Sequence, residues 1–228
     1  MNTKILNILC EGSTEELFAK HILKPFLQRN AIVVKYRKVG GTGGLSKYQP
    51  VKDDLITWGK EVWGRSSETH YFTTMIDFFE LPGSFPEYKE SEQYTDVYAK
   101  VQFLETAFRE DICKQEPRFS DCFIPYFQLH EFEALLFSDI KKLTKFYPDR
   151  AKAILNLDKV LATEYKGNPE LVNHEPSKAP SKRIIHAVDG IQYDKPNIGR
   201  WVSEDIGIST LKEKCRHFNE WTDKLMQL

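Results

Sequence analysis

The stretch KILNILCEGSTEE, residues 4–16, joins a short apolar run to a polar turn that holds three glutamates. The run at 4–10 has the length and composition of a buried strand. From Ser13 to about residue 27 the apolar residues follow a helical spacing, and Ser13 and Glu16 have the spacing of a capping box. We therefore expect the first strand to turn at once into a helix that begins at Ser13.

The same alternation continues along the chain. Short apolar or β-branched runs predict further strands at 31–36, 71–76 and 122–129. Helical patterns occupy 48–63 and 95–113, and another helix is expected to begin within 130–137. Strands that alternate with helices indicate an α/β fold with a mostly parallel sheet of about four strands, flanked by helices.

The pattern changes after residue 138, where short helical segments are separated by prolines. The last predicted helix, at 209–226, carries one apolar stripe: Leu211, Cys215, Phe218, Trp221 and Leu225. We predict an α/β core at 1–138 and a helical extension at 139–228. The extension is expected to pack on the core and to supply one wall of the functional site.

Composition limits the possible functions. The 228 residues include 32 basic and 33 acidic ones, so any contact with nucleic acid must use a local basic patch. The four cysteines are scattered and form no CxxC pair, which disfavours a zinc site and favours a reducing cytoplasm. No apolar stretch approaches membrane-spanning length, so we expect no membrane partner.

Acidic residues follow three of the predicted strands. Glu11 follows the first, Asp77 the third, and Glu131 and Glu133 the fourth. The carboxyl ends of parallel strands lie at one edge of a sheet, where ligands bind, so these carboxylates should converge. Converging carboxylates repel one another unless a cation joins them, and oxygen ligands suit Mg²⁺ or Mn²⁺.

Each acid also has a local explanation. Glu15 and its neighbour can simply favour the positive end of a helix, and Asp77 can initiate a turn. His130 and Glu131 do not begin an HExxH zinc motif, because position 134 is alanine. Glu131 is preferred to Glu133 as the ligand since it lies nearer the strand end. His130 is either a general base or second-shell donor, or a buried histidine with satisfied hydrogen bonds.

Two further segments are candidates for phosphate contacts. Lys178, Lys182 and Arg183 surround an expected helix start, an arrangement that suits phosphate, although a solvated basic turn has the same composition. The glycine-rich segment 40–44 lacks the GK[ST] ending of a P-loop, and is either a mobile lid or a loose connection.

The strand followed by EGSTE at 11–15, together with the later strand that ends at Asp77, resembles the Toprim domain. That domain occurs in type IA and II topoisomerases, bacterial primases and nucleases of the overcoming-lysogenization-defect group. The segments PYFQLHEFEALLFSD, NPELVN, APSKRI and CRHFNEW resemble a bacterial domain-of-unknown-function family with a Toprim-like core. The resemblance extends from residue 4 to about residue 221.

The resemblance implies a Rossmann-like core and a Mg²⁺ site. Glu11 matches the Toprim glutamate, Glu15 an acidic position of the nuclease branch, and Asp77 the first aspartate of a DxD pair. Position 79 is phenylalanine, so the pattern reads DxxE, and Glu80, Glu131 or Glu133 would replace the second aspartate. Lys182 loosely matches the basic residue that steadies the transition state. Such proteins are often encoded beside an ATPase of the AAA or ABC type in systems that resemble phage defence.

These observations lead to one principal hypothesis and two alternatives. The principal one is a metal-dependent nuclease for DNA or structured RNA such as tRNA, with Glu11, Asp77 and Lys182 as catalytic residues. Lys178, Lys182 and Arg183 would hold phosphate. The first alternative is a non-catalytic docking or sensing subunit of an ATPase complex. The second is a small phosphoester hydrolase or nucleotide-binding protein that uses the same carboxylates.

Overall fold

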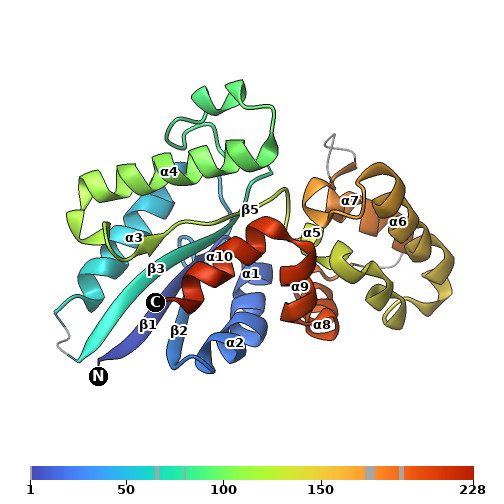
Figure 1. The fold of residues 1–228 in the computed structure, drawn as a ribbon, viewed down its shortest axis with the longest axis horizontal. Helices are drawn as coiled ribbons and strands as arrows, with labels where there is room; N and C mark the ends of the chain where they lie inside the picture. Colours follow the sequence, from blue (N-terminus) through green and yellow to red (C-terminus); the bar gives the residue numbers. More distant parts are fainter. Residues whose placement is uncertain (1, 65–66, 80, 173–177, 190–192) are drawn as a thin grey trace.

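The computed structural model describes residues 2–64, 67–79, 81–172, 178–189 and 193–228. Its centre is a parallel sheet in the order β2-β1-β3-β4, with β5 also paired to β3 (Figure 1). The strands are β1 (Thr3–Cys10), β2 (Ile32–Lys38), β3 (Glu68–Asp77), β4 (Phe123–Ile124) and β5 (Phe127–Gln128). The predicted α/β fold with a mostly parallel sheet is therefore confirmed.

The predicted single strand at 122–129 is two short strands, and Pro125 lies between them. Proline has no N–H for the ladder, so regular pairing with β3 stops there. The hydroxyl of Thr74 on β3 bridges the break, since it accepts from the Tyr126 N–H at 2.9 Å and donates to the Tyr126 carbonyl at 3.0 Å. Both strands thus remain in register with the same partner.

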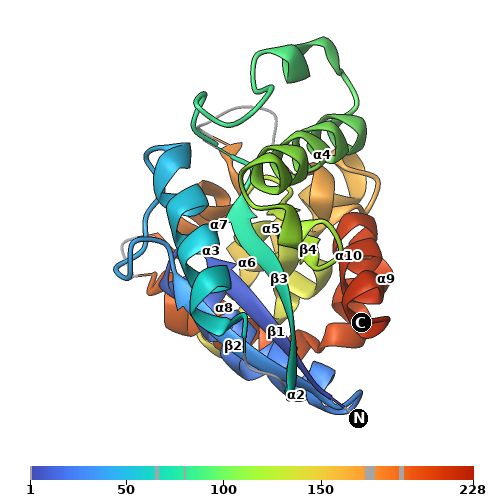
Figure 2. The ribbon, with the colours of Figure 1, turned by 90° about the vertical axis from the view of Figure 1, so that its left-hand side faces the viewer.

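Helices cover both faces of the sheet (Figure 2). One face carries the helix that joins β1 to β2, which consists of α1 (Ser13–Phe18), a π-helical turn (η1, Ala19–Leu23) and α2 (Lys24–Gln28). The other face carries α3 (Tyr48–Val62) and α4 (Val97–Gln115). The first helix begins at Ser13, as expected, but its N-cap is Gly12. Glu15 rather than Glu16 reaches back, and its Oε2 accepts from the Gly12 N–H at 2.9 Å.

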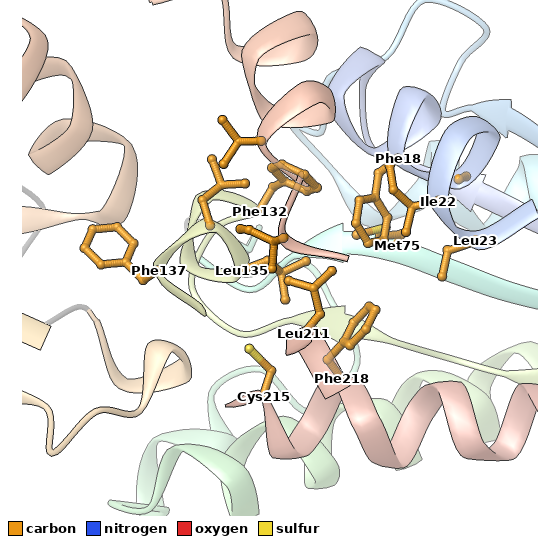
Figure 3. Packing of buried hydrophobic residues seen from close by; sticks show 14 of the residues in the cluster. Phe18, Ile22, Leu23, Met75, Phe132, Leu135, Phe137, Leu211, Cys215 and Phe218 are labelled. Carbon is orange, nitrogen blue, oxygen red and sulfur yellow. The ribbon is translucent and has the colours of Figure 1, made fainter. Parts of the chain in front are cut away.

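The larger hydrophobic cluster joins the first helix to distant parts of the chain. Figure 3 shows Phe18 and Ile22 packed beside Met75 of β3, with Phe132 and Phe218 adjacent. All five side chains are buried. The cluster includes residues on both sides of position 138, so the predicted core and extension share one hydrophobic interior.

The extension consists of short helices (Figure 1). α5 (Glu133–Leu136) comes just before position 138. It is followed by η4 (Phe137–Lys145), α6 (Ala151–Glu164), α7 (Pro180–Val188), α8 (Lys195–Ile206), α9 (Ile208–Lys214) and α10 (Arg216–Met226). α6 and α7 lie away from the sheet at the right of Figure 1, and the chain then returns through α8 and α9 to α10, which lies beside the sheet. Single 3₁₀ turns occur at η2 (Glu90–Gln93), η3 (Pro117–Phe119), η5 (Pro148–Arg150) and η6 (Pro169–Leu171). None of the described helices is long and apolar enough to cross a lipid bilayer.

The predicted helix at 209–226 is interrupted at Cys215, whose backbone is extended (φ −115°, ψ 100°). The interruption has a clear cause, because buried Glu170 accepts from the N–H groups of His217 and Phe218, both at 3.0 Å, and so caps a new helix. The predicted apolar stripe is nevertheless fully buried on α9 and α10. Trp221 of α10 donates from Nε1 to the hydroxyl of Thr73 on β3 at 2.9 Å, which fixes the helix on the sheet.

Candidate functional site

The candidate site lies where the strand order reverses. From β1 the chain goes to β2 on one side and then returns to β3 on the other, so the carboxyl ends of β1 and β3 flank a topological switch point. Glu11 and Asp77 stand at these two ends. The Glu11 N–H donates to the Met75 carbonyl at 2.9 Å, and Glu11 Oε2 accepts from the Asp77 N–H at 2.9 Å. The predicted convergence of these two residues is therefore observed.

Glu15 lies in the first turn of α1 and is 5% exposed. Burial, followed by repulsion from Glu11, raises the pKa of Glu15 to about 7 against opposing main-chain hydrogen bonds. Burial also raises the pKa of Glu11, although the hydrogen bond from Asp77 opposes the shift. The local turn therefore holds two carboxyl groups that resist ionising together.

Asp77 has a buried carboxylate oxygen that no donor or cation of the described residues contacts. Its Oδ1 is shut off from solvent and has no hydrogen-bond partner. Burial raises the pKa of Asp77 well above its ordinary value, and repulsion from Glu15, Glu11 and Glu133 adds to the shift. A buried carboxylate without a partner is costly, so this position is stable either protonated or beside a cation.

Glu133 completes the group from the first turn of α5, where its side chain is fully buried. Its Oε1 lies 3.2 Å from the Lys195 Nζ and accepts a long hydrogen bond from the Tyr193 hydroxyl at 3.5 Å. Its Oε2 has no partner. Burial raises the pKa of Glu133 to about 7, although Lys195 opposes the shift.

Glu131 lies in a different environment from Glu133. Both of its carboxylate oxygens accept from Ser181 at the start of α7, one from the N–H at 2.8 Å and the other from the hydroxyl at 2.9 Å. Glu131 thus caps a helix, whereas Glu133 joins the acidic group. The expected role of Glu131 as a metal ligand stays a prediction, but the contacts favour Glu133.

Lys195 is a charged member of the candidate site that the sequence did not point to. It is the first residue of α8, and its charge opposes the raised pKa values of Glu11, Glu15, Asp77 and Glu133. Burial alone would lower the pKa of Lys195, but the carboxylates, Glu133 foremost, raise it above its ordinary value. Lys195 is therefore the cation that this acidic group shares.

The packing of α8 explains how Lys195 reaches the sheet edge. Gly199, one turn further along, touches both Phe132 and α1. A Cβ on Gly199 would lie 2.9 Å from the ring of Phe132 and 3.4 Å from Thr14. The glycine therefore lets α8 approach the EGSTE turn closely. The one sequence signal for this position is Asp194-Lys195-Pro196, which marks a helix start.

The predicted basic cluster is not gathered around these carboxylates. Arg183 donates to the Tyr165 hydroxyl at 2.6 Å and to the Lys178 carbonyl at 2.8 Å, which binds its guanidinium to the end of α6. The side chain of Lys182 is exposed. These residues form a rim on α7, and their role in phosphate binding stays a prediction.

His130 and Glu80 are the remaining candidates from the sequence. His130 is buried and adopts φ 63°, a conformation uncommon outside glycine, which turns the chain from β5 toward α5. Its carbonyl accepts from the Phe79 N–H at 2.7 Å, so it fixes the segment that follows Asp77. Glu80 lies outside the described residues.

The acidic group suits a divalent cation by charge, although its side chains are not arranged as ligands. Within the described ranges, no three Asp, Glu, His or Cys side chains form a ready metal-binding group. Two buried carboxylate oxygens without partners, on Asp77 and Glu133, are nevertheless hard donors of the kind that Mg²⁺ and Mn²⁺ prefer. Ligation would require these side chains to rotate toward a common centre.

A family model described as "Domain of unknown function (DUF4276)" matches residues 10–226. The chain therefore belongs to this family, and the match includes both the acidic group and the helical extension. Searches of curated proteins and of solved structures each gave no significant match.

Proposed function

We propose that this member of the DUF4276 family is a Mg²⁺- or Mn²⁺-dependent nuclease that hydrolyses phosphodiester bonds at the carboxyl ends of β1 and β3. The observation that carries the proposal is the buried, unpartnered Oδ1 of Asp77 among three other carboxyl groups. A structural carboxylate normally has its hydrogen bonds satisfied, whereas a carboxylate that receives a cation keeps an oxygen available.

Glu11, Asp77 and Glu133 are the proposed ligands, with Glu15 as a further acidic partner. A bound divalent cation would neutralise charge on the phosphate and lower the pKa of water. The pKa of Glu15, about 7, suits a group that accepts or donates a proton near neutral pH. Lys195 Nζ, at 3.2 Å from Glu133, is placed to hold a phosphate oxygen at the same edge.

The arrangement of the acids also supports a Toprim-like core. A glutamate follows β1, an aspartate ends β3, and these two strands are neighbours in a parallel sheet. This arrangement supports a nucleic-acid substrate, and from the sequence resemblance we further propose an ATPase partner and a role in phage defence. The four cysteines are free thiols, which supports the proposed cytoplasmic location.

The test is cleavage of plasmid DNA and total tRNA during a Mg²⁺ or Mn²⁺ titration. Wild type is compared with Glu11→Gln and Asp77→Asn, and the matched control is Glu110→Gln, an exposed site on α4. We expect cation-dependent cleavage that both site variants lose and the control keeps. Cation binding, measured calorimetrically, should fall in the same two variants.

Two outcomes contradict the proposal. One is full cleavage by both site variants. The other is a wild-type protein that neither cleaves nor binds either cation, alone or with an ATPase encoded beside it. In the second case, co-purification with that ATPase would favour the docking subunit, whereas hydrolysis of mononucleotides alone would favour the small phosphoesterase.

A further inference from the structure

A cavity of about 390 Å³ lies at the carboxyl end of β2. Its walls come from the end of β2, the first helix and the outward side of α3. The residues that matter for its chemistry are Glu16, Arg37, Lys38, Asp54, Trp58 and Glu61. Because β2 is an edge strand, this hollow is open along the side of the sheet.

The glycine-rich loop joins this cavity to the EGSTE turn. Gly41 lines the cavity, and the Gly44 N–H donates to the Glu11 carbonyl at 2.8 Å. Gly43 has φ +87°, and a Cβ there would lie 3.1 Å from both the Glu11 carbonyl oxygen and the Gly12 Cα. One loop thus lines the cavity and is fixed against the main chain of the turn that carries Glu11, which connects the cavity to the acidic group.

The cavity contains a cation held over an aromatic ring. The guanidinium of Arg37 lies over the ring of Trp58, 4.4 Å from its centroid, and pairs with Glu61 at 2.7 Å. About half of each charged side chain is exposed, so the ion pair is weak and can reorganise around a ligand. An arginine held over an indole can offer its other side for stacking, as arginine planes do to bases in RNA recognition.

The charges around the cavity disfavour a phosphate. Three carboxylates, from Glu16, Asp54 and Glu61, face only two cations, Arg37 and Lys38. Lys38 Nζ is itself near Glu16 at 3.8 Å. A neutral group with N–H donors fits this balance better, since carboxylates accept from exocyclic amino groups.

We propose that this cavity receives the base of an unpaired nucleotide next to the phosphate held at the acidic group. The base stacks on Arg37 and donates an amino group to a carboxylate, so adenine, cytosine or guanine is preferred to uracil or thymine. The proposal rests on the proposed nuclease function and specifies its substrate: a single-stranded segment with an amino-bearing base at this position.

The test is fluorescence anisotropy with labelled RNA hexamers A6, C6 and U6 in Ca²⁺, which allows binding to be followed without relying on turnover. Wild type should bind A6 and C6 about tenfold more tightly than U6, because a hydrogen bond from a base amino group discriminates by about this factor or more against a base that lacks the group. Arg37→Ala should lose this preference. Thr57→Arg, at an exposed position of α3, fills the cavity and should also lose the preference for A6 and C6, even though its added positive charge favours RNA binding in general.

The matched control is Lys35→Ala. Lys35 lies two residues before Arg37 on β2 and points to the same face of the sheet, but does not line the cavity. This variant should keep the tenfold preference. When an abasic residue replaces each cytidine of C6 in turn, the affinity of wild type should fall at one position. The affinity of Arg37→Ala should not change at any position.

Equal affinity of wild type for the three hexamers, or an unchanged preference in Arg37→Ala and Thr57→Arg, would overturn the base subsite. Absence of any hexamer binding would overturn it as well. The nuclease function is decided separately, because cleavage by wild type that Glu11→Gln loses would stand in either case. Conversely, Glu11→Gln should retain the base preference.

Discussion

Glu131 closes the N-terminus of α7 through Ser181, whose main-chain N–H and hydroxyl each donate to a different oxygen of the same carboxylate, at 2.8 and 2.9 Å. Both residues are buried. The HEFE and PSKR segments, which suggested chemistry in the sequence, are thus joined to each other. The two glutamates of HEFE therefore differ: Glu131 caps α7 with both of its oxygens, whereas Glu133 keeps one oxygen without a partner.

Replacing Glu131 should therefore reduce stability. Glu131→Ala leaves two buried donors of Ser181 without a partner, and we expect a loss on the order of 3 kcal/mol in the free energy of unfolding. Urea denaturation measures it, with Glu131→Gln expected to be intermediate and exposed Lys182→Ala near wild type. Loss of cleavage without loss of stability would instead identify Glu131 as a ligand.

A second buried glutamate should be equally important for folding. Glu170 accepts from the N–H groups of His217 and Phe218 and from the Tyr98 hydroxyl, all at 3.0 Å. Glu170→Ala should destabilise the chain by on the order of 4 kcal/mol, because buried main-chain donors lose their acceptor. Tyr98→Phe removes the hydrogen bond to Glu170 and the one that the Tyr98 hydroxyl accepts from the Asn168 amide at 2.8 Å, but it leaves both main-chain donors capped and should cost only about 2 kcal/mol. Equal losses in the two variants would contradict the capping role.

The acidic group should make stability depend on pH. The folded pKa of Glu15 is raised from an ordinary 4.5 to about 7, so stability is greatest below the lower value and falls as pH rises through the higher one. Without divalent cations the contribution is on the order of 3 kcal/mol. Urea unfolding in EDTA from pH 4 to 8 should show this decline in wild type. Glu15→Gln, which keeps an oxygen for Gly12, should show a smaller decline; an equal one would contradict the assignment.

Lys195 and Lys182 can be distinguished by one pair of variants. Lys195→Ala removes the cation at Glu133 and should lower kcat by about a hundredfold or more, as expected for the loss of a charged group at a reacting phosphate. Mn²⁺ affinity should rise in the same variant, because Glu133 no longer pairs with an ammonium group. Lys182→Ala should leave Mn²⁺ affinity unchanged. If Lys182→Ala lowered kcat and Lys195→Ala changed neither kcat nor Mn²⁺ affinity, Lys182 rather than Lys195 would be the catalytic lysine.

The strands were predictable because short apolar runs that alternate with helical patterns usually form buried strands of an α/β sheet. Glu11 and Asp77 followed from the same reasoning, since both stand directly after such runs. The break in the last strand comes from Pro125, whose missing N–H was visible in the sequence but whose effect depends on the Thr74 hydroxyl.

Lys195 was not predictable by the same route, because its position depends on how α8 packs. That packing requires Gly199 to meet Phe132 and Thr14, which are more than 60 residues away along the chain. The contacts of Glu131 with Ser181 were not predictable for a related reason, because distance from a strand end says nothing about which helix start lies nearby. Tertiary contacts, rather than local pattern, decided both positions.

The fixing of α10 on β3 has a consequence for synthesis of the protein. Trp221 and Thr73 are 148 positions apart, so a growing chain makes the central strand long before the helix that covers it. Until residues 216–226 have been made, one face of the sheet lacks Phe218, Trp221 and Leu225. The part of this apolar face that α10 covers therefore stays exposed until the last helix is made, which is the period when a bound chaperone would protect the nascent chain from aggregation.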